Sequence, residues 1–317
     1  TEDTAADEKM LRAIYTAALT TSPAYEQLRE LTTKYPGRLS GSKNLEGAVL
    51  WGEAVLKATG ADRTELQPVL VPHWERGAPE SVKLGHRPLA AAALGNSGAT
   101  PAGGLTAPVI ELTSLDALQS AEVKGKIVFF NRPMNPRPIS TGLAYGEAGD
   151  QRNRGPAAAA KHGAVGALVR SLTLALDDHP HTGNTTFPPG TPRLPAAALS
   201  TVAADNLSAA LKQDPALTVE MTINARSFDD APSHNVIGEL KGTAQPEKII
   251  LVGGHLDSWD IAPGAHDDGA GCVQSIEVLR LLKAVGYTPR HTLRVVLFTN
   301  EENGLRGATA YSTAAKA

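Results

Sequence analysis

Two short apolar runs in the last third of the chain predict strands. Ile249–Gly254 and Leu293–Thr299 are nearly continuous in apolar residues, which is typical of strands buried in the sheet of an α/β fold. Between them, apolar residues recur at every third position and predict a helix with one apolar face: Val273, Ile276, Leu279 and Leu282. Gly286, followed by Pro289, marks the expected end of this helix. The pattern therefore indicates a strand, a helix and a second strand in succession.

The first part of the chain has the spacing of helices. Helical character covers Glu8–Leu19, Ala24–Thr33 and Leu45–Lys57. The turn-forming residues of Tyr35–Gly41 interrupt it between the last two of these segments.

From about Val71 the pattern changes. Up to about Glu220 the chain is rich in Pro and Gly and contains short β-like runs: Ala107–Glu111, Ile127–Phe130 and Val165–Val169. The earlier pattern returns with a strand at Asn235–Leu240. We therefore expect an α/β fold, in which a mixed, largely parallel sheet flanked by helices is interrupted by a β-rich insert. The expected boundaries are 1–75 and 221–317 for the two parts of the main domain and 76–220 for the insert.

Composition narrows the classes of partner. The 317 residues carry a formal net charge of −3, which gives no electrostatic basis for binding nucleic acid or an anionic membrane. No apolar run approaches the roughly 20 residues needed to cross a bilayer. The only cysteine is Cys272, which excludes an internal disulfide. The chain starts at Thr1 with neither Met nor an apolar stretch, so we expect a removed export signal and a secreted or periplasmic protein.

Histidine and acidic residues gather just past the predicted strands. His255 and Asp257 follow the first strand, Asp267 precedes the helix, and Glu301 and Glu302 follow the second strand. Open α/β sheets bind ligands at the carboxyl ends of their strands. Imidazole and carboxylate groups without cysteine suit a hydrolytic zinc site better than a structural one.

The positions of these residues favour distinct roles. Two zinc ions about 3.5 to 4 Å apart need a bridging carboxylate, and Asp267 at a loop-to-helix junction is the candidate. Adjacent side chains near a strand end point in different directions, so we expect Glu302 to bind metal and Glu301 to act as general base. Asp257 is placed to orient the imidazole of His255. The alternative is that these are polar residues at loop tips, with Glu301 a surface glutamate beside a ligand.

Three segments resemble the metal-binding motifs of the co-catalytic zinc peptidases of the aminopeptidase Y type: Gly254-His-Leu-Asp-Ser-Trp-Asp260, Gly264-Ala-His-Asp-Asp-Gly-Ala-Gly271 and Thr299-Asn-Glu-Glu-Asn-Gly-Leu-Arg-Gly307. The resemblance implies that His255 binds one zinc ion, Asp267 bridges and Glu302 binds the other. It also implies Glu301 as base, Asp257 as orienting partner and a cis peptide bond after Asp267.

The resemblance extends over nearly the whole chain. A closer match to one member of this family rests on Arg38–Ser42, Pro180–Gly183 and Trp259-Asp260. Lys124–Phe130, followed by an Ala-rich helix and Gly163–Arg170, is similar to a protease-associated domain. The resemblance therefore predicts a protease-associated-like insert within a zinc-peptidase-like scaffold.

The family also implies ligands that do not occur before Ala317. It adds an acidic residue after the glutamate pair and a histidine farther along, so this chain supplies only part of the expected set: His255, Asp267 and Glu302. We therefore expect a C-terminally truncated fragment of a longer enzyme, with a sheet that is incomplete at that end.

The expected function is that of a zinc-dependent exopeptidase or dipeptidase, a metallopeptidase that acts on short peptides with two zinc ions per complete site. The resemblance adds a homodimer. One alternative is a non-catalytic binding or receptor-like relative, and another is a single-zinc cyclising acyltransferase on the same scaffold. His179 and His181 lie in a loop rich in Pro, Gly and Thr, where they could face the substrate or hold a separate metal. We expect His266 to lie beside the ligands without binding metal.

Overall fold

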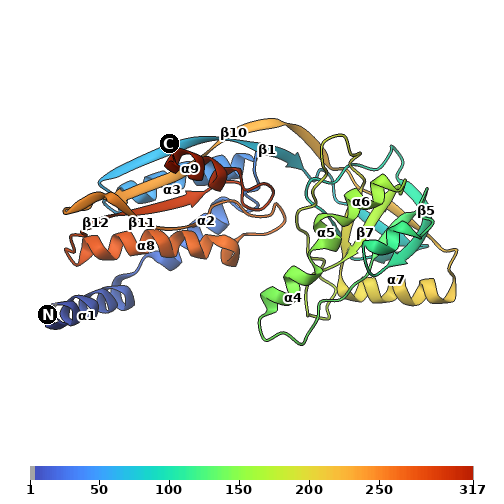
Figure 1. Cartoon of the computed structure of the whole chain (residues 1–317), viewed down its shortest axis with the longest axis horizontal. Coiled ribbons are helices and arrows are strands. Elements are labelled where there is room, and N and C mark those ends of the chain that lie inside the picture. The colour runs from blue at the N-terminus through green and yellow to red at the C-terminus, as the bar shows by residue number, and fades with distance from the viewer. Residues whose placement is uncertain (1–3, 317) are drawn as a thin grey trace. The chain divides into compact units, whose positions relative to one another are not determined.

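The structure is a computed structural model that describes residues 4–316, and the chain divides into two compact units (Figure 1). Unit 1 comprises the residues up to His73 together with those from Asp229 onward, and unit 2 comprises Trp74–Phe228. The sequence placed the boundaries at 75/76 and 220/221. The second one lies later in the structure because β9 (Thr218–Thr222) pairs with two strands of unit 2.

Unit 1 is built on a four-stranded sheet in the order β1-β10-β12-β11. Strands β1 and β10 continue across the unit boundary. The elements are α1 (Thr4–Thr21), α2 (Ala24–Lys34), α3 (Lys43–Ala58), β1 (Arg63–Glu75), β10 (Arg226–Leu240), β11 (Gln245–His255), the irregular turn η2 (Ala265–Gly269), α8 (Ala270–Ala284), β12 (His291–Phe298) and α9 (Arg306–Lys316). The predicted N-terminal helices and the predicted succession of strand, helix and strand are confirmed.

The sheet of unit 1 is mixed, as expected, and its pairings include both a parallel and an antiparallel one. Strand β12 pairs in parallel with β11 and antiparallel with β10. The connection between β10 and β11 spans only residues 241–244, which is too short for a parallel crossover, so β11 runs antiparallel to β10, with β12 between them. The helical crossover through α8 then returns the chain parallel to β11.

Strand β11 lies at an edge of this sheet, and the expectation that it is buried on both faces is wrong. Ile249, Ile250 and Leu251 are 43%, 53% and 42% exposed. The apolar run was read as buried because a sequence pattern does not distinguish a central strand from an edge strand.

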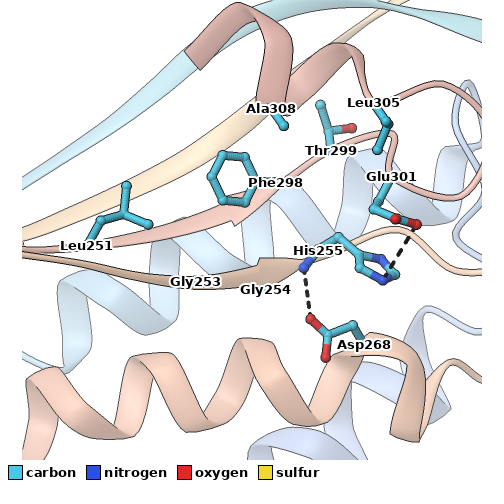
Figure 2. A pocket seen from close by; sticks show the side chains of 10 residues that line it. All are labelled: Leu251, Gly253, Gly254, His255, Asp268, Phe298, Thr299, Glu301, Leu305 and Ala308. Atoms are coloured by element: carbon cyan, nitrogen blue, oxygen red, sulfur yellow. Dashed lines mark hydrogen bonds and ion pairs between the residues drawn. The ribbon is translucent and has the colours of Figure 1, made fainter. Parts of the chain in front are cut away.

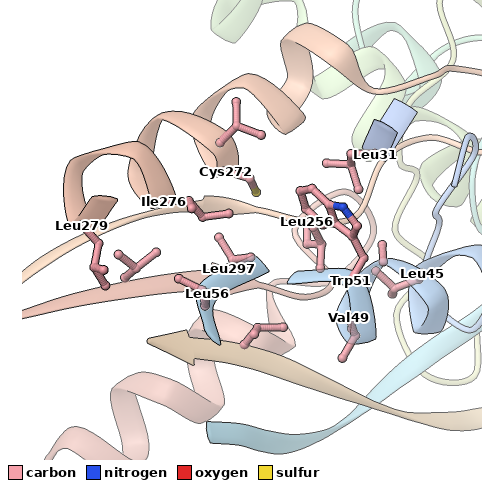
Figure 3. Close-up of a cluster of buried hydrophobic side chains, with 14 of the residues drawn as sticks. Leu31, Leu45, Val49, Trp51, Leu56, Leu256, Cys272, Ile276, Leu279 and Leu297 are labelled. Carbon is pink, nitrogen blue, oxygen red and sulfur yellow. The ribbon is translucent and has the colours of Figure 1, made fainter. Parts of the chain in front are cut away.

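The core of unit 1 lies between the sheet and three helices (Figure 3). Alternate residues of β12, including Val295 and Leu297, pack against buried side chains of α2, α3 and α8. The intervening residues point to the other face, where Phe298 makes an edge-on contact with Tyr311 of α9 at 5.7 Å between ring centroids. Helices on both faces thus hold β12 and the loop after it.

The buried face of α8 gives a stability prediction. Ile276→Val removes one methylene from a fully buried side chain, and we expect it to lower the free energy of unfolding by about 0.5–1.5 kcal/mol. Val278→Ala on the same helix is the control, because its side chain is 38% exposed, and we expect a change within about 0.5 kcal/mol. Denaturant unfolding of both variants measures the difference. Equal losses would contradict the assignment of the buried face.

Unit 2 contains an eight-stranded mixed sheet in the order β3-β2-β9-β5-β6-β7-β8-β4. Strands β5 to β8 are parallel neighbours within it. Besides β9, its elements are β2 (Ser81–Leu84), β3 (Arg87–Leu89), β4 (Ala91–Ala93), β5 (Leu105–Leu112), the turn η1 (Asp116–Gln119), β6 (Ile127–Phe130), α4 (Thr141–Ala148), α5 (Asp150–Asn153), α6 (Gly155–Lys161), β7 (Gly166–Arg170), β8 (Ala196–Leu199) and α7 (Thr201–Gln213). The three strands expected between Ala107 and Val169 are confirmed.

Some elements were missed in the sequence. Helix α7 begins at the N-cap Ser200, whose side chain accepts a hydrogen bond from Ala203 N, and it buries residues at helical spacing. Both signals were present in the sequence.

Among the described residues, no helix is long and apolar enough to cross a membrane.

Candidate metal centre

Three loops bring the candidate ligands together at one edge of the sheet of unit 1. His255 is the last residue of β11 and pairs in register with Phe298, the last residue of β12. Glu301 and Glu302 therefore follow at the same end of the two parallel strands. Asp267 comes from η2, directly before α8. One potential ligand atom each of His255, Asp267 and Glu302 lies within 4.8 Å of the other two. The structure therefore assembles the three predicted ligands.

The imidazole of His255 is fixed by its two nitrogens. Nδ1 lies 3.0 Å from the backbone oxygen of Asp257, and 3.7 Å from the nearer carboxylate oxygen of that residue. Nε2 lies 2.9 Å from Asp267 Oδ1 and 3.9 Å from Glu301 Oε2. Figure 2 shows the Glu301 carboxylate facing this ring. A hydrogen on Nδ1 leaves Nε2 free to bind a cation.

The carboxylate of Asp257 holds the glutamate pair. This side chain is fully buried, and its two oxygens accept hydrogen bonds from the backbone N–H groups of Glu301 and Glu302, each at 3.0 Å. A charged acceptor makes these bonds stronger than neutral ones. Asp257 therefore contacts His255 and both glutamates, and it links the β11 and β12 loops.

Asp268 supports the site from below (Figure 2). Its Oδ2 accepts a hydrogen bond from His255 N at 3.0 Å, and its Oδ1 accepts one from Gly271 N at 3.1 Å in the first turn of α8. An added Cβ on Gly254 would meet Asp268 Oδ2 at 2.4 Å, so glycine is required there. The peptide bond between Asp267 and Asp268 is cis, as the family resemblance implied. This role of Asp268 was not predicted from the sequence, although an Asp three residues before a helical N–H is a capping signal.

The electrostatics of the site favour a cation. Burial raises the pKa of Glu302, and the charges of Asp267 and Asp257 raise it further, to about 8. Burial also raises the pKa of Glu301, against the lowering effect of His255. For His255, burial lowers the pKa, but the hydrogen bond and charge of Asp257 and the charges of both glutamates outweigh it and raise the pKa to about 10. Burial and the neighbouring negative charges thus disfavour the ionised form of both glutamates, and a bound cation would oppose this effect.

A cavity of about 230 Å³ adjoins the site (Figure 2). His255 and Glu301 form part of its wall, and most of the remainder is apolar, including Leu251, Phe298 and Leu305. The titrating groups of the site therefore lie at the border between polar loops and an apolar wall.

The other histidines take no part in this cluster. Among the described residues, a single group of three or more His, Cys, Asp or Glu side chains is arranged to hold a metal, and it contains His255 alone of the histidines. His266, next to Asp267, is outside it. His179 and His181 belong to unit 2 and form no such group.

Comparisons with known proteins find relatives of this chain among peptidases. The profile of peptidase family M28 matches residues 235–317. Carboxypeptidase Q of Bos taurus is 40% identical over 292 residues, which cover 91% of this chain and 60% of the relative, and that of Homo sapiens is 39% identical over the same shares. The chain thus spans about 60% of the length of these two curated relatives.

Solved structures match the fold as well. The crystal structure of a peptidase M28 precursor from Shewanella amazonensis SB2B has a TM-score of 0.91 and 36% identity, covering 98% of this chain and 71% of that one. An aminopeptidase from Aneurinibacillus sp. strain AM-1 has a TM-score of 0.64 at 24% identity, covering 92% of this chain and 65% of that one, a likeness that concerns the fold alone. The first of these matches extends over both units.

Proposed function

The chain belongs to peptidase family M28, and from this premise we propose that the protein is a zinc-dependent exopeptidase or dipeptidase that hydrolyses short peptides. The observation that carries the proposal is the convergence of His255, Asp267 and Glu302 within 4.8 Å, with the Glu301 carboxylate beside them. The relatives named carboxypeptidase Q support a substrate with a free terminus.

The residues present fit zinc. An imidazole nitrogen and carboxylate oxygens without thiolate form the donor set of catalytic zinc sites. We propose two zinc ions, with His255 on one, Glu302 on the other and Asp267 between them. The Asp267 side chain is 74% exposed, which leaves room for a second ion at its carboxylate. Bound zinc would lower the pKa of a water molecule and polarise the carbonyl of the peptide bond.

Glu301 is the proposed general base. Its carboxylate faces the same space as His255 Nε2, at 3.9 Å, and its backbone is fixed by Asp257. It would accept the proton of the attacking water and deliver it to the leaving amine. The raised pKa of Glu301 suits this transfer, because a base with a pKa nearer neutrality also serves as an acid. Asp257 would orient His255 through Nδ1 and the glutamates through their N–H groups.

Unit 2 is proposed to be the protease-associated-like insert. Supporting this, its strands β5 to β8 and the Ala-rich α6 lie where the sequence showed that likeness. The family resemblance further suggests a homodimer, which analytical ultracentrifugation of the purified protein tests. The likeness to peptidases over both units gives the exopeptidase more support than a binding relative or an acyltransferase.

Hydrolysis of dipeptides tests the proposal directly. A panel of dipeptides with free or blocked termini is incubated with the purified full-length protein, and released amines are quantified. We expect activity that is abolished by a chelator and restored by zinc, with a preference set by the free termini. Metal-loaded protein that releases no amine from any of these peptides would contradict the proposed function.

The raised pKa values predict that zinc binding depends on pH. In the metal-free protein, the pKa of His255 is about 10 and that of Glu302 about 8, so both groups retain protons at pH 7. Zinc requires the neutral imidazole and the ionised carboxylate. Binding should therefore release up to about two protons, and zinc affinity should rise between about pH 6 and 8, about tenfold per pH unit for each proton released.

Titration calorimetry in buffers of different ionisation enthalpy counts these protons. The metal-free fold should show the opposite trend, because both pKa values are raised. The contribution of His255 to the stability of the fold is complete below about pH 6.5, the pKa of histidine in the unfolded chain. It is lost as the pH rises through about 10, the pKa of His255 in the fold. Zinc affinity that does not change between about pH 6 and 8 would contradict the prediction.

A further inference from the structure

Arg38 is a fully buried cation that contacts the loop between His255 and Asp267. It lies in the turn between α2 and α3, and each hydrogen bond of its guanidinium group goes to a backbone carbonyl. The acceptors are Leu256 O at 2.6 Å, Pro263 O at 2.7 Å, Gly264 O at 2.9 Å and Tyr35 O at 3.4 Å. Burial lowers the pKa of this guanidinium, against the raising effects of Cys272, Asp257 and Glu302. Such a buried charge needs its full set of acceptors.

The backbone around Arg38 interlocks with the same loop. Gly37 N donates to Ala262 O at 3.0 Å, and Ser258 N donates to Arg38 O at 3.2 Å. Gly37 and Gly264 both have positive φ, at 59° and 61°. An added Cβ on Gly264 would lie 2.7 Å from an Arg38 guanidinium nitrogen. Arg38 therefore fills a space that the loop at residues 256–264 closes around.

This loop sets the distance between two proposed ligands. It begins directly after His255 and ends shortly before Asp267, and it contains no helix or strand to hold its shape. Arg38 donates hydrogen bonds to both ends of this loop, to the backbone oxygen of Leu256 at one end and to those of Pro263 and Gly264 at the other. The fork of the guanidinium group thereby fixes the span from His255 to Asp267.

The segment that contains Arg38 also contacts the loop of Glu301 and Glu302. Ser40 Oγ accepts a hydrogen bond from Asn300 Nδ2 at 2.8 Å, and both residues are buried. Asn300 has a φ of 61°, the left-handed turn conformation that Asn tolerates, and Glu301 and Glu302 follow it directly. Its backbone oxygen accepts from Leu305 N at 2.6 Å, which closes the turn.

We propose that Arg38 and Ser40 are positioning residues of the metal centre, which hold the loops of His255, Asp267 and the glutamate pair at the spacing that zinc requires. The proposal rests on the proposed function, because it takes zinc as the metal. Neither side chain binds the metal or the peptide. Their effect is preorganisation, because without them the ligand loops must be ordered by the metal itself, at the expense of affinity.

Zinc affinity and the visible spectrum of the cobalt-substituted protein test this role. Arg38→Lys keeps the charge but loses the planar fork, since one ammonium group cannot reach carbonyls on both ends of the loop. We expect it to weaken zinc binding about 10- to 100-fold and to change the cobalt d–d bands. Ser40→Ala should shift the same bands with a smaller loss of affinity. Arg29→Lys, on the exposed face of α2, is the matched control and should match the unmodified protein in both measurements.

Chemical rescue separates positioning from general support of the fold. In Arg38→Ala, guanidinium ions at low millimolar concentration should restore zinc affinity, whereas urea at the same concentration should not. Folded Arg38→Lys and Ser40→Ala proteins with unchanged affinity and unchanged cobalt spectra would overturn the proposal, even if their melting temperatures fell. If Arg38→Lys does not fold, Ser40→Ala decides by the same two measurements. An unmodified protein that binds no zinc would instead contradict the proposed function itself.

Discussion

Replacing Asp267 by alanine is expected to remove at least one zinc ion from the metal centre and to abolish hydrolysis. The Asp267 carboxylate lies 2.9 Å from His255 Nε2 and is the proposed bridge between the two ions. Neither Asp257 nor Asp268 substitutes for it, because both oxygens of each carboxylate accept backbone N–H groups. A terminal ligand without the bridge holds its ion weakly. Elemental analysis of the purified variant measures the loss.

Glu247→Ala is the control for the Asp267 variant. Glu247 is an exposed acid on β11 in the same unit, so its removal changes the net charge equally and leaves the site intact. This control should keep the zinc content of the unmodified protein. Two zinc ions retained in Asp267→Ala would refute the bridging role.

Glu301→Gln is expected to leave the zinc content nearly intact while lowering turnover by about 100-fold or more, the effect of a lost general base. Glutamine has nearly the same shape but cannot accept the proton of the attacking water. The hydrogen bond from the backbone N–H of residue 301 to Asp257 is independent of this side chain, so the loop should keep its position. Steady-state kinetics on metal-loaded protein, with zinc content measured on the same sample, tests the prediction.

The adjacent Glu302→Gln variant is the matched comparison. Its side chain is a proposed ligand within the cluster of His255 and Asp267, so this variant should lose zinc first and activity as a consequence. The two neighbouring glutamates should thus respond differently to the same chemical change. Near-normal turnover in Glu301→Gln, or equal zinc loss in both variants, would show that their roles are wrongly assigned.

The strands and their chemistry were readable in the sequence because their signals are local. The apolar runs of β11 and β12 and the polar residues directly after them place His255 and the glutamates at strand ends. Parallel strands then bring these ends to the same edge of a sheet. The Asp-Asp-Gly segment before α8 likewise predicted that Asp267 lies at the junction of a loop and a helix.

Burial and sheet direction were decided by tertiary structure. The apolar run in β11 could not reveal that this strand is an edge of the sheet, with Ile250 53% exposed. The antiparallel pairing of β10 with β12 depends on which strands become neighbours, a choice that no single segment encodes.

The sequence by itself determined which residues are candidates for the chemistry of this protein, and only the tertiary structure decided what holds them in place. Arg38 contacts Leu256, and Ser40 contacts Asn300, across more than two hundred positions of the chain. The hydrogen bonds from His255 N to Asp268 and from Glu301 N to Asp257 also join separate segments. A ligand motif is visible because its residues are close in sequence. Asp257 was predicted as a partner of His255 for the same reason, but the other supports were not visible, because a hydrogen bond between distant segments forms only after folding has brought them together.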